Sequence, residues 1–167
     1  MSELDSESLA LKREIEAAFA DVRSPGDAED DLCESLDGGT REEVLRLFGG
    51  KRWQDYKDEP LALLLPDPKL PNTVSSGALS PRAFRYFLPV FLLGSAFHRR
   101  QLDAIPEYLL HDFVDERMEL LSGAQLKAVL SFLGYMKKRY EGFGGEKLGE
   151  AVASVKGLLD RAAARPQ

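Results

Sequence analysis

The chain has 167 residues, with 22 Lys and Arg against 28 Asp and Glu, and 44 % of its residues are hydrophobic. At ~100 to 200 residues per domain, this length predicts one domain over residues 1–167 with a single core. One cysteine excludes an internal disulfide framework.

The N-terminal residues and the longest apolar stretch bear on location. Glu3, Asp5 and Glu7 stand where a signal peptide carries basic residues, so we expect no secretory or transit segment and a cytoplasmic protein. The longest apolar stretch, residues 86–97, is interrupted by Pro89 and is shorter than the ~20 residues that a membrane-spanning helix needs. We therefore expect this stretch to be core and expect no membrane partner.

Acidic residues are concentrated in an N-terminal segment, residues 1–37. This segment holds 12 acids and 3 bases, a net charge of −9, whereas residues 38–167 have a net charge of +3. Because nucleic-acid affinity depends on clustered Lys and Arg, the balance argues against a nucleic-acid partner and favours a basic protein partner. A charge run that only keeps the protein soluble is the alternative.

The first half of the chain predicts two helices and a loop. Apolar residues recur at three- and four-residue steps after Asp5, which predicts an amphipathic helix that ends before Pro25. Thr40 and Glu43 have the spacing of a capping box, which predicts a short helix from Thr40 to Phe48. Prolines are frequent over residues 60–79, so we expect a loop there.

Residues 81–97 predict the central helix of the fold. Ser80 is a good N-cap and Pro81 suits the first helical position. Apolar residues occur nearly all round this helix, so we expect other helices to surround it. Pro89 lies in its interior and predicts a kink there.

Two more helices are predicted near the C-terminus. Ser122 and Gln125 form a second capping box, followed by an apolar face that leads to Lys137. After a glycine-rich stretch at 142–145, a last helix has an apolar stripe that either covers the core or faces a partner. No segment has the alternation of a strand, so the fold class is all-α, a single-domain bundle of about five to seven helices around residues 81–97.

Several motifs together resemble an uncharacterised bacterial family, a domain of unknown function found as single small cytoplasmic proteins. The most specific is Ser-Pro-Arg-Ala-Phe-Arg-Tyr-Phe-Leu-Pro-Val-Phe-Leu at 80–92, beside the Trp-Gln-Asp segment at 53–55 and the Gln125 capping box. The resemblance covers residues 9–140 and implies a small helical protein. It implies no activity, cofactor or catalytic residue.

Few residues point to catalysis. His111 and Asp115 would share a face if residues 111–116 were helical, but a catalytic zinc needs three protein ligands. The acids around Cys33 disfavour its thiolate, so we expect it to be inert. We predict no metal site, no cofactor and no catalytic residue, although whether the chain is an enzyme stays open.

The function predicted best is a non-enzymatic protein-interaction module, of which immunity and inhibitor proteins are examples. Trp53 either anchors a recognition surface or packs beneath the helix that ends at Phe48. Arg82 and Arg85 either meet an acidic groove or pair with the N-terminal acids, and the intramolecular pairing is the more economical interpretation. The candidate partner-binding residues are Asp27, Glu29, Asp30, Asp31, Glu34, Arg52, Trp53 and Asp55.

The alternative is a small-ligand-binding protein or an enzyme. A proline kink can open a helical core, and a pocket near Trp53, Pro89 and His111 would combine apolar walls with polar groups. The oligomeric state is not predicted.

Overall fold

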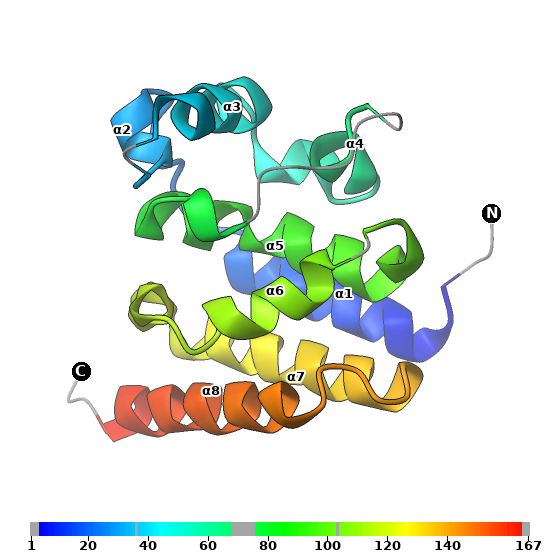
Figure 1. The fold of residues 1–167 in the computed structure, drawn as a ribbon. Coiled ribbons are helices and arrows are strands. Elements are labelled where there is room, and N and C mark those ends of the chain that lie inside the picture. The colour runs from blue at the N-terminus through cyan, green and yellow to red at the C-terminus, as the bar shows by residue number, and fades with distance from the viewer. Residues whose placement is uncertain (1–3, 36, 68–75, 103, 165–167) are drawn as a thin grey trace.

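The computed structural model describes residues 4–35, 37–67, 76–102 and 104–164 (Figure 1), and these contain eight α-helices and no strand, which confirms the all-α fold class. Four short 3₁₀ turns connect them: η1 (Trp53–Tyr56), η2 (Ser76–Ala78), η3 (Arg99–Gln101) and η4 (Glu116–Leu120). The helices are α1 (Ser6–Phe19), α2 (Glu29–Leu32), α3 (Gly38–Phe48), α4 (Leu61–Leu64), α5 (Pro81–Phe97), α6 (Ile105–Asp112), α7 (Gly123–Arg139) and α8 (Glu146–Ala164).

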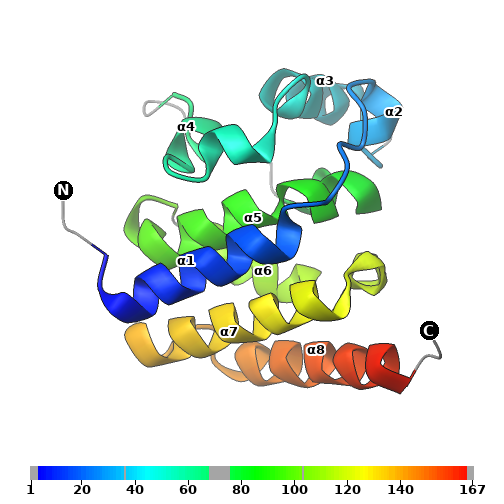
Figure 2. The same ribbon diagram turned by 180° about the vertical axis from the view of Figure 1, so that it is seen from behind.

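Helix α5 occupies the centre of the bundle, as predicted. Helices α2, α3 and α4 lie on one side of it, and α7 and α8 form the opposite side, with α1 and α6 flanking α5 (Figures 1 and 2). Thirteen of the 17 residues of α5 are buried, because its apolar side chains point in every direction. The helix continues through Pro89 without interruption, and the bend there stays a prediction.

Side-chain caps fix several helix starts where the sequence predicts them. Asp5 accepts a hydrogen bond from the Ser8 amide at 2.8 Å and caps α1, and Ser80 accepts one from the Ala83 amide at 3.2 Å and caps α5. Ser122 and Gln125 form the expected capping box of α7. These caps satisfy amide groups that have no partner within the helix.

The predicted capping box at Thr40 is wrong. Helix α3 begins two residues earlier, at Gly38, and Asp37 is its N-cap. The Asp37 carboxylate accepts hydrogen bonds from both the amide (2.9 Å) and the hydroxyl (2.7 Å) of Thr40. An aspartate placed before Gly38 can therefore satisfy the first amides of the helix, and Thr40 becomes an interior donor.

The predicted loop at 60–79 contains a turn of helix. Residues 61–64 form α4, in which Leu63 and Leu64 are buried at 1 % exposure each, and η2 precedes α5. Pro60 directly before α4 is compatible with a helix start, because proline has no amide hydrogen to satisfy. Residues 68–75, the middle of this loop, lie outside the described residues.

Helix α8 covers the core. Leu148 and Val155 on its stripe are buried, and Val152 and Leu159 are half-buried against the same hydrophobic cluster. In the parts of the chain that the structure describes, no helix is long and apolar enough to cross a membrane. The two single-turn helices, α2 and α4, bring the number of helices above the predicted five to seven.

Candidate interaction surface

Residues 27–43, which comprise α2, the first part of α3 and the connection between them, carry eight carboxylates and one base, a net charge of −7. We call this segment the acidic layer. It lies on the outer side of α5 (Figures 1 and 2) and is anchored there by the buried side chain of Leu32 and by that of Val44, the next residue of α3. The anchoring residues are apolar, so the charged side chains lie toward solvent.

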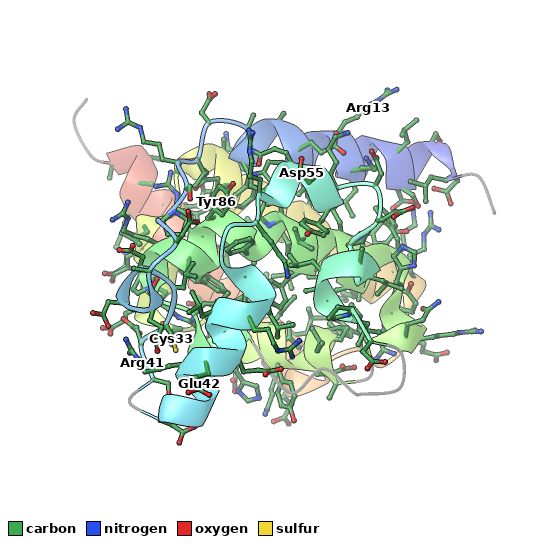
Figure 3. All side chains as sticks on the ribbon, turned by 90° about the horizontal axis from the view of Figure 1, so that it is seen from above. Arg13, Cys33, Arg41, Glu42, Asp55 and Tyr86 are labelled. Atoms are coloured by element: carbon green, nitrogen blue, oxygen red, sulfur yellow. The ribbon has the colours of Figure 1, made fainter. Side chains whose placement is uncertain are left out.

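Arg41 is the single base of the acidic layer, and it ties α2 to α3. Its Nε lies 3.2 Å from a Glu29 carboxylate oxygen, its Nη2 bonds the Asp30 carboxylate, and its Nη1 donates to the Ser35 carbonyl at 3.0 Å. Figure 3, seen from above the layer, shows Arg41 on the side of α3 nearest Cys33. One guanidinium thus fixes the shape of the layer without neutralising it, because seven carboxylates remain in excess.

The other predicted acids of this layer serve different local roles. Asp27 accepts a hydrogen bond from the Gly50 amide at 3.2 Å, and Asp31 accepts one from the Ala28 amide at 3.3 Å. Glu34 is exposed, and its carboxylate has no partner within the described residues. Asp27, Glu29, Asp30, Asp31 and Glu34 thus all lie in or beside α2, within one stretch of the acidic layer.

An exposed leucine accompanies these charges. Leu45 of α3 is 37 % exposed, with the exposed Glu42 one turn before it and the exposed Arg46 beside it. Glu42 has no hydrogen-bond or ion-pair partner within the described residues. An apolar side chain with charged neighbours has the composition of an interface with a hydrophobic centre and a polar rim.

Among the described residues, neither Arg82 nor Arg85 makes the predicted pairing with N-terminal acids. Arg85 instead donates from Nε to the Gln125 side chain at 3.0 Å, and Arg82 has no ion pair within the described residues. Acids of α1 pair with the end of α7, since Arg139 contacts Asp5 at 2.6 Å and Lys138 contacts Glu7 at 3.1 Å. The hydrogen bond from the Ser8 amide, with that from Arg139, lowers the pKa of Asp5 to about 2.

Trp53 belongs to the core rather than to a surface. Its side chain is 2 % exposed because η1 packs against α5, and its indole Nε1 has no hydrogen-bond partner among the described residues. The neighbouring Arg52 and Asp55 are exposed, and Figure 3 shows Asp55 on the same side of the molecule as α3. Trp53 therefore cannot anchor a partner in this structure, and of the three only Arg52 and Asp55 remain candidates.

The residues of the alternative pocket differ in their exposure to solvent. Trp53 and Pro89 are buried, whereas His111 is exposed on α6, where its Nε2 lies 2.7 Å from Lys147 Nζ. Helix α6 ends at Asp112, so His111 and Asp115 are not on one helical face. The described residues contain no group of three His, Cys, Asp or Glu side chains placed to hold a metal ion.

A buried ion pair was not predicted from the sequence. Arg117 and Asp112 are 5 % and 6 % exposed. Burial raises the pKa of the Asp112 carboxyl, although the hydrogen bond from Ser76 and the positive charge of Arg117 act to lower it. Arg117 also donates to the Ser76 and Leu79 carbonyls at 2.9 and 3.1 Å. Because its donors are used within the protein, this pair holds η2 and η4 together and is a structural element.

Comparisons with protein-family models, with curated proteins and with solved structures find no match. The resemblance to an uncharacterised bacterial family thus stays a prediction.

Proposed function

We propose that the chain is a non-enzymatic protein-interaction module whose acidic layer binds a basic surface of a partner protein. The observation that carries the proposal is the net charge of −7 over residues 27–43, displayed on one outer layer of the bundle. Opposite charge on a partner would accelerate association and orient the complex. Immunity and inhibitor proteins are examples of modules that act in this way.

Two features of the layer support this role over simple solubility. Arg41 links Glu29 and Asp30 across two helices, so the carboxylates are held in a fixed arrangement. Leu45 exposes an apolar side chain beside Glu42, and apolar contact at the centre of an interface supplies affinity that surface charge pairs alone do not. A segment that served only solubility needs neither feature.

The experiment compares two variants with the same change of net charge. Glu34→Lys with Glu42→Lys reverses two unpartnered carboxylates of the acidic layer and leaves the Arg41 contacts in place. The matched control, Glu141→Lys with Glu150→Lys, reverses two exposed carboxylates near and on α8. Each tagged protein is used to capture partners from native lysate, and the captured protein is then purified and its affinity measured.

A basic protein that binds the wild type and the control, but binds the acidic-layer variant at least tenfold more weakly, supports the proposal. Leu45→Ser should weaken the same complex in salt that screens charge, because its contribution is apolar. An equal loss of affinity in both charge variants would contradict the proposal, because it would show that binding depends on net charge and not on the acidic layer. A captured partner that is unaffected by any of these changes would contradict the use of this surface.

A further inference from the structure

A groove of about 370 Å³ lies at the end of the bundle where α1 ends and α5 begins. Figures 1 and 2 both place η4 and the start of α7 at this same end. We call it the arginine groove, because it is lined by Asp21, Val22, Arg23, Arg82, Arg85 and Leu120. Its three guanidiniums and one carboxylate give it a net charge of +2 in a chain whose net charge is −6.

None of these three arginines is neutralised within the described residues. Arg23 and Arg82 are exposed and have no ion pair, and Arg85 makes only the Nε hydrogen bond to Gln125. Five other arginines each pair with a carboxylate, whereas four more described arginines outside the groove, Arg13, Arg52, Arg100 and Arg161, have no ion pair within the described residues. The paired ones are Arg41, Arg46, Arg99, Arg117 and Arg139. The groove therefore gathers positive charge that the protein's own acids leave unpaired.

Gln125 gives Arg85 a fixed orientation. The Gln125 side chain is 3 % exposed; its Oε1 accepts from Arg85 Nε at 3.0 Å and from the Ser122 amide at 2.9 Å, and its Nε2 donates to the Ala18 carbonyl at 3.1 Å. These bonds join α1, α5 and α7 beneath the groove. They hold Arg85 by one nitrogen and leave its two terminal NH₂ groups free, and those are the groups that bind an oxyanion in bidentate fashion.

Arg82 and Arg85 are three residues apart on α5 and so lie on neighbouring positions of one helical face. Like charges at this spacing repel each other, and an anion bound between them would relieve the repulsion. Val22 and Leu120, which is 44 % exposed, offer apolar surface next to these charges. The site thus combines two positive charges, which match the charge of a dianion, with apolar surface that can contact an organic group.

We propose that the arginine groove binds a small organic phosphate, with the phosphate dianion between Arg82 and Arg85 and the organic part against Val22 and Leu120. The volume lies in the range of about 300 to 1,000 Å³ that is usual for small-molecule sites. Asp21 is the one carboxylate among the lining residues and suits a hydroxyl or amine of the ligand. This binding site is separate from the acidic layer and does not depend on its proposed role.

The test is titration calorimetry with phenyl phosphate, inorganic phosphate and phenol as probes. We expect phenyl phosphate to bind more tightly than inorganic phosphate, and phenol not to bind measurably. Arg82→Gln and Arg85→Gln should each weaken phenyl phosphate binding about tenfold or more, since each removes a charged donor. Arg100→Gln is the matched control, because Arg100 is exposed, has no ion pair within the described residues and does not line the groove.

Each other outcome contradicts the proposal in a defined way. Absence of binding by both phosphates at millimolar concentration, with the protein shown to be folded by circular dichroism, would exclude an anion site in the groove. Equal weakening in Arg100→Gln would show nonspecific attraction to positive charge. Tighter binding of a polyglutamate peptide than of phenyl phosphate, lost in Arg82→Gln, would replace the small-molecule ligand with an acidic protein segment.

Discussion

Arg117 and Asp112 form an ion pair of 2.7 Å between Nη2 and Oδ1 in which both side chains are almost fully buried. The guanidinium also lies 4.4 Å from the centre of the Phe84 ring, so it contacts the central helix. Asp112→Asn would remove the buried partner of Arg117 and leave Asp115, a more exposed carboxylate whose Oδ1 lies 3.1 Å from Arg117 Nε, as its remaining counter-charge. Removing one partner of a buried pair typically costs about 3 to 5 kcal/mol, and we expect a loss in the free energy of unfolding at the lower end of this range, because Asp115 compensates part of the charge.

Urea unfolding of the purified variant measures this change. Glu116→Gln is the control, because Glu116 lies on the same turn, is exposed and has no partner within the described residues. The control should alter the free energy of unfolding by less than about 0.5 kcal/mol. If Asp112→Asn lowered the free energy of unfolding by less than about 0.5 kcal/mol as well, water would reach the ion pair, and the ion pair would not hold η4 to the core.

The pKa of the Asp5 carboxyl determines how the contact between α1 and α7 depends on pH. Its pKa of about 2 in the folded protein lies below the ordinary value of 3.8, so the charged form stabilises the folded state. This stabilisation is complete above about pH 4 and is lost as the pH falls through 2. Asp5→Ala should therefore lower the melting temperature at neutral pH, and the difference from wild type should shrink between pH 4 and pH 2.

Thermal unfolding followed by circular dichroism over this pH range provides the measurement. Asp160→Ala is the control for the loss of an exposed carboxylate in general, because Asp160 is exposed and has no partner among the described residues. Its melting temperature should follow that of the wild type at every pH. A gap for Asp5→Ala that stayed constant down to pH 2 would show that the carboxylate is not the group responsible.

Signals from residues that are close together in the sequence were sufficient to predict the long helices. The apolar stripe of α1, the Ser80-Pro81 start of α5 and the Ser122–Gln125 box of α7 each involve residues within four positions of one another, and each was predicted correctly. The burial of α5 on all sides also followed from its composition. These features depend on neighbouring residues, which a sequence displays directly.

Contacts between distant residues could not be predicted in this way. The bond from Arg85 to Gln125 joins residues 40 positions apart, and the Arg117 bond to the Ser76 carbonyl joins residues 41 apart. Their geometry depends on how the helices pack, so the sequence left the partners of these arginines undetermined. Trp53 was undecided for the same reason, because an aromatic residue suits a core and an interface equally.

Asp37 and Thr40 could each cap the start of α3, and their contributions can be tested separately. We expect Asp37→Ala to accelerate hydrogen exchange of the Thr40 amide, because this amide donates to the Asp37 carboxylate at 2.9 Å. Thr40→Val removes only the hydroxyl bond and should change the exchange of its own amide less. Exchange measured by NMR distinguishes the two, and equal acceleration in both variants would contradict Asp37 as the principal cap.

Gly94 lies where α5 packs against α4, the turn of helix within the predicted loop. A Cβ atom at this position would lie 2.7 Å from Leu64 Cδ1 and 3.1 Å from Leu102 Cδ1, and both leucines are buried. Gly94→Ala should therefore lower the free energy of unfolding by about 1 to 3 kcal/mol through overpacking. Gly134→Ala on α7 meets nothing within 4 Å and should raise it by about 0.4 to 1 kcal/mol, because alanine favours helix. Urea unfolding of the two variants compares them directly, and an equal gain in both would show that α4 does not pack against α5 as described.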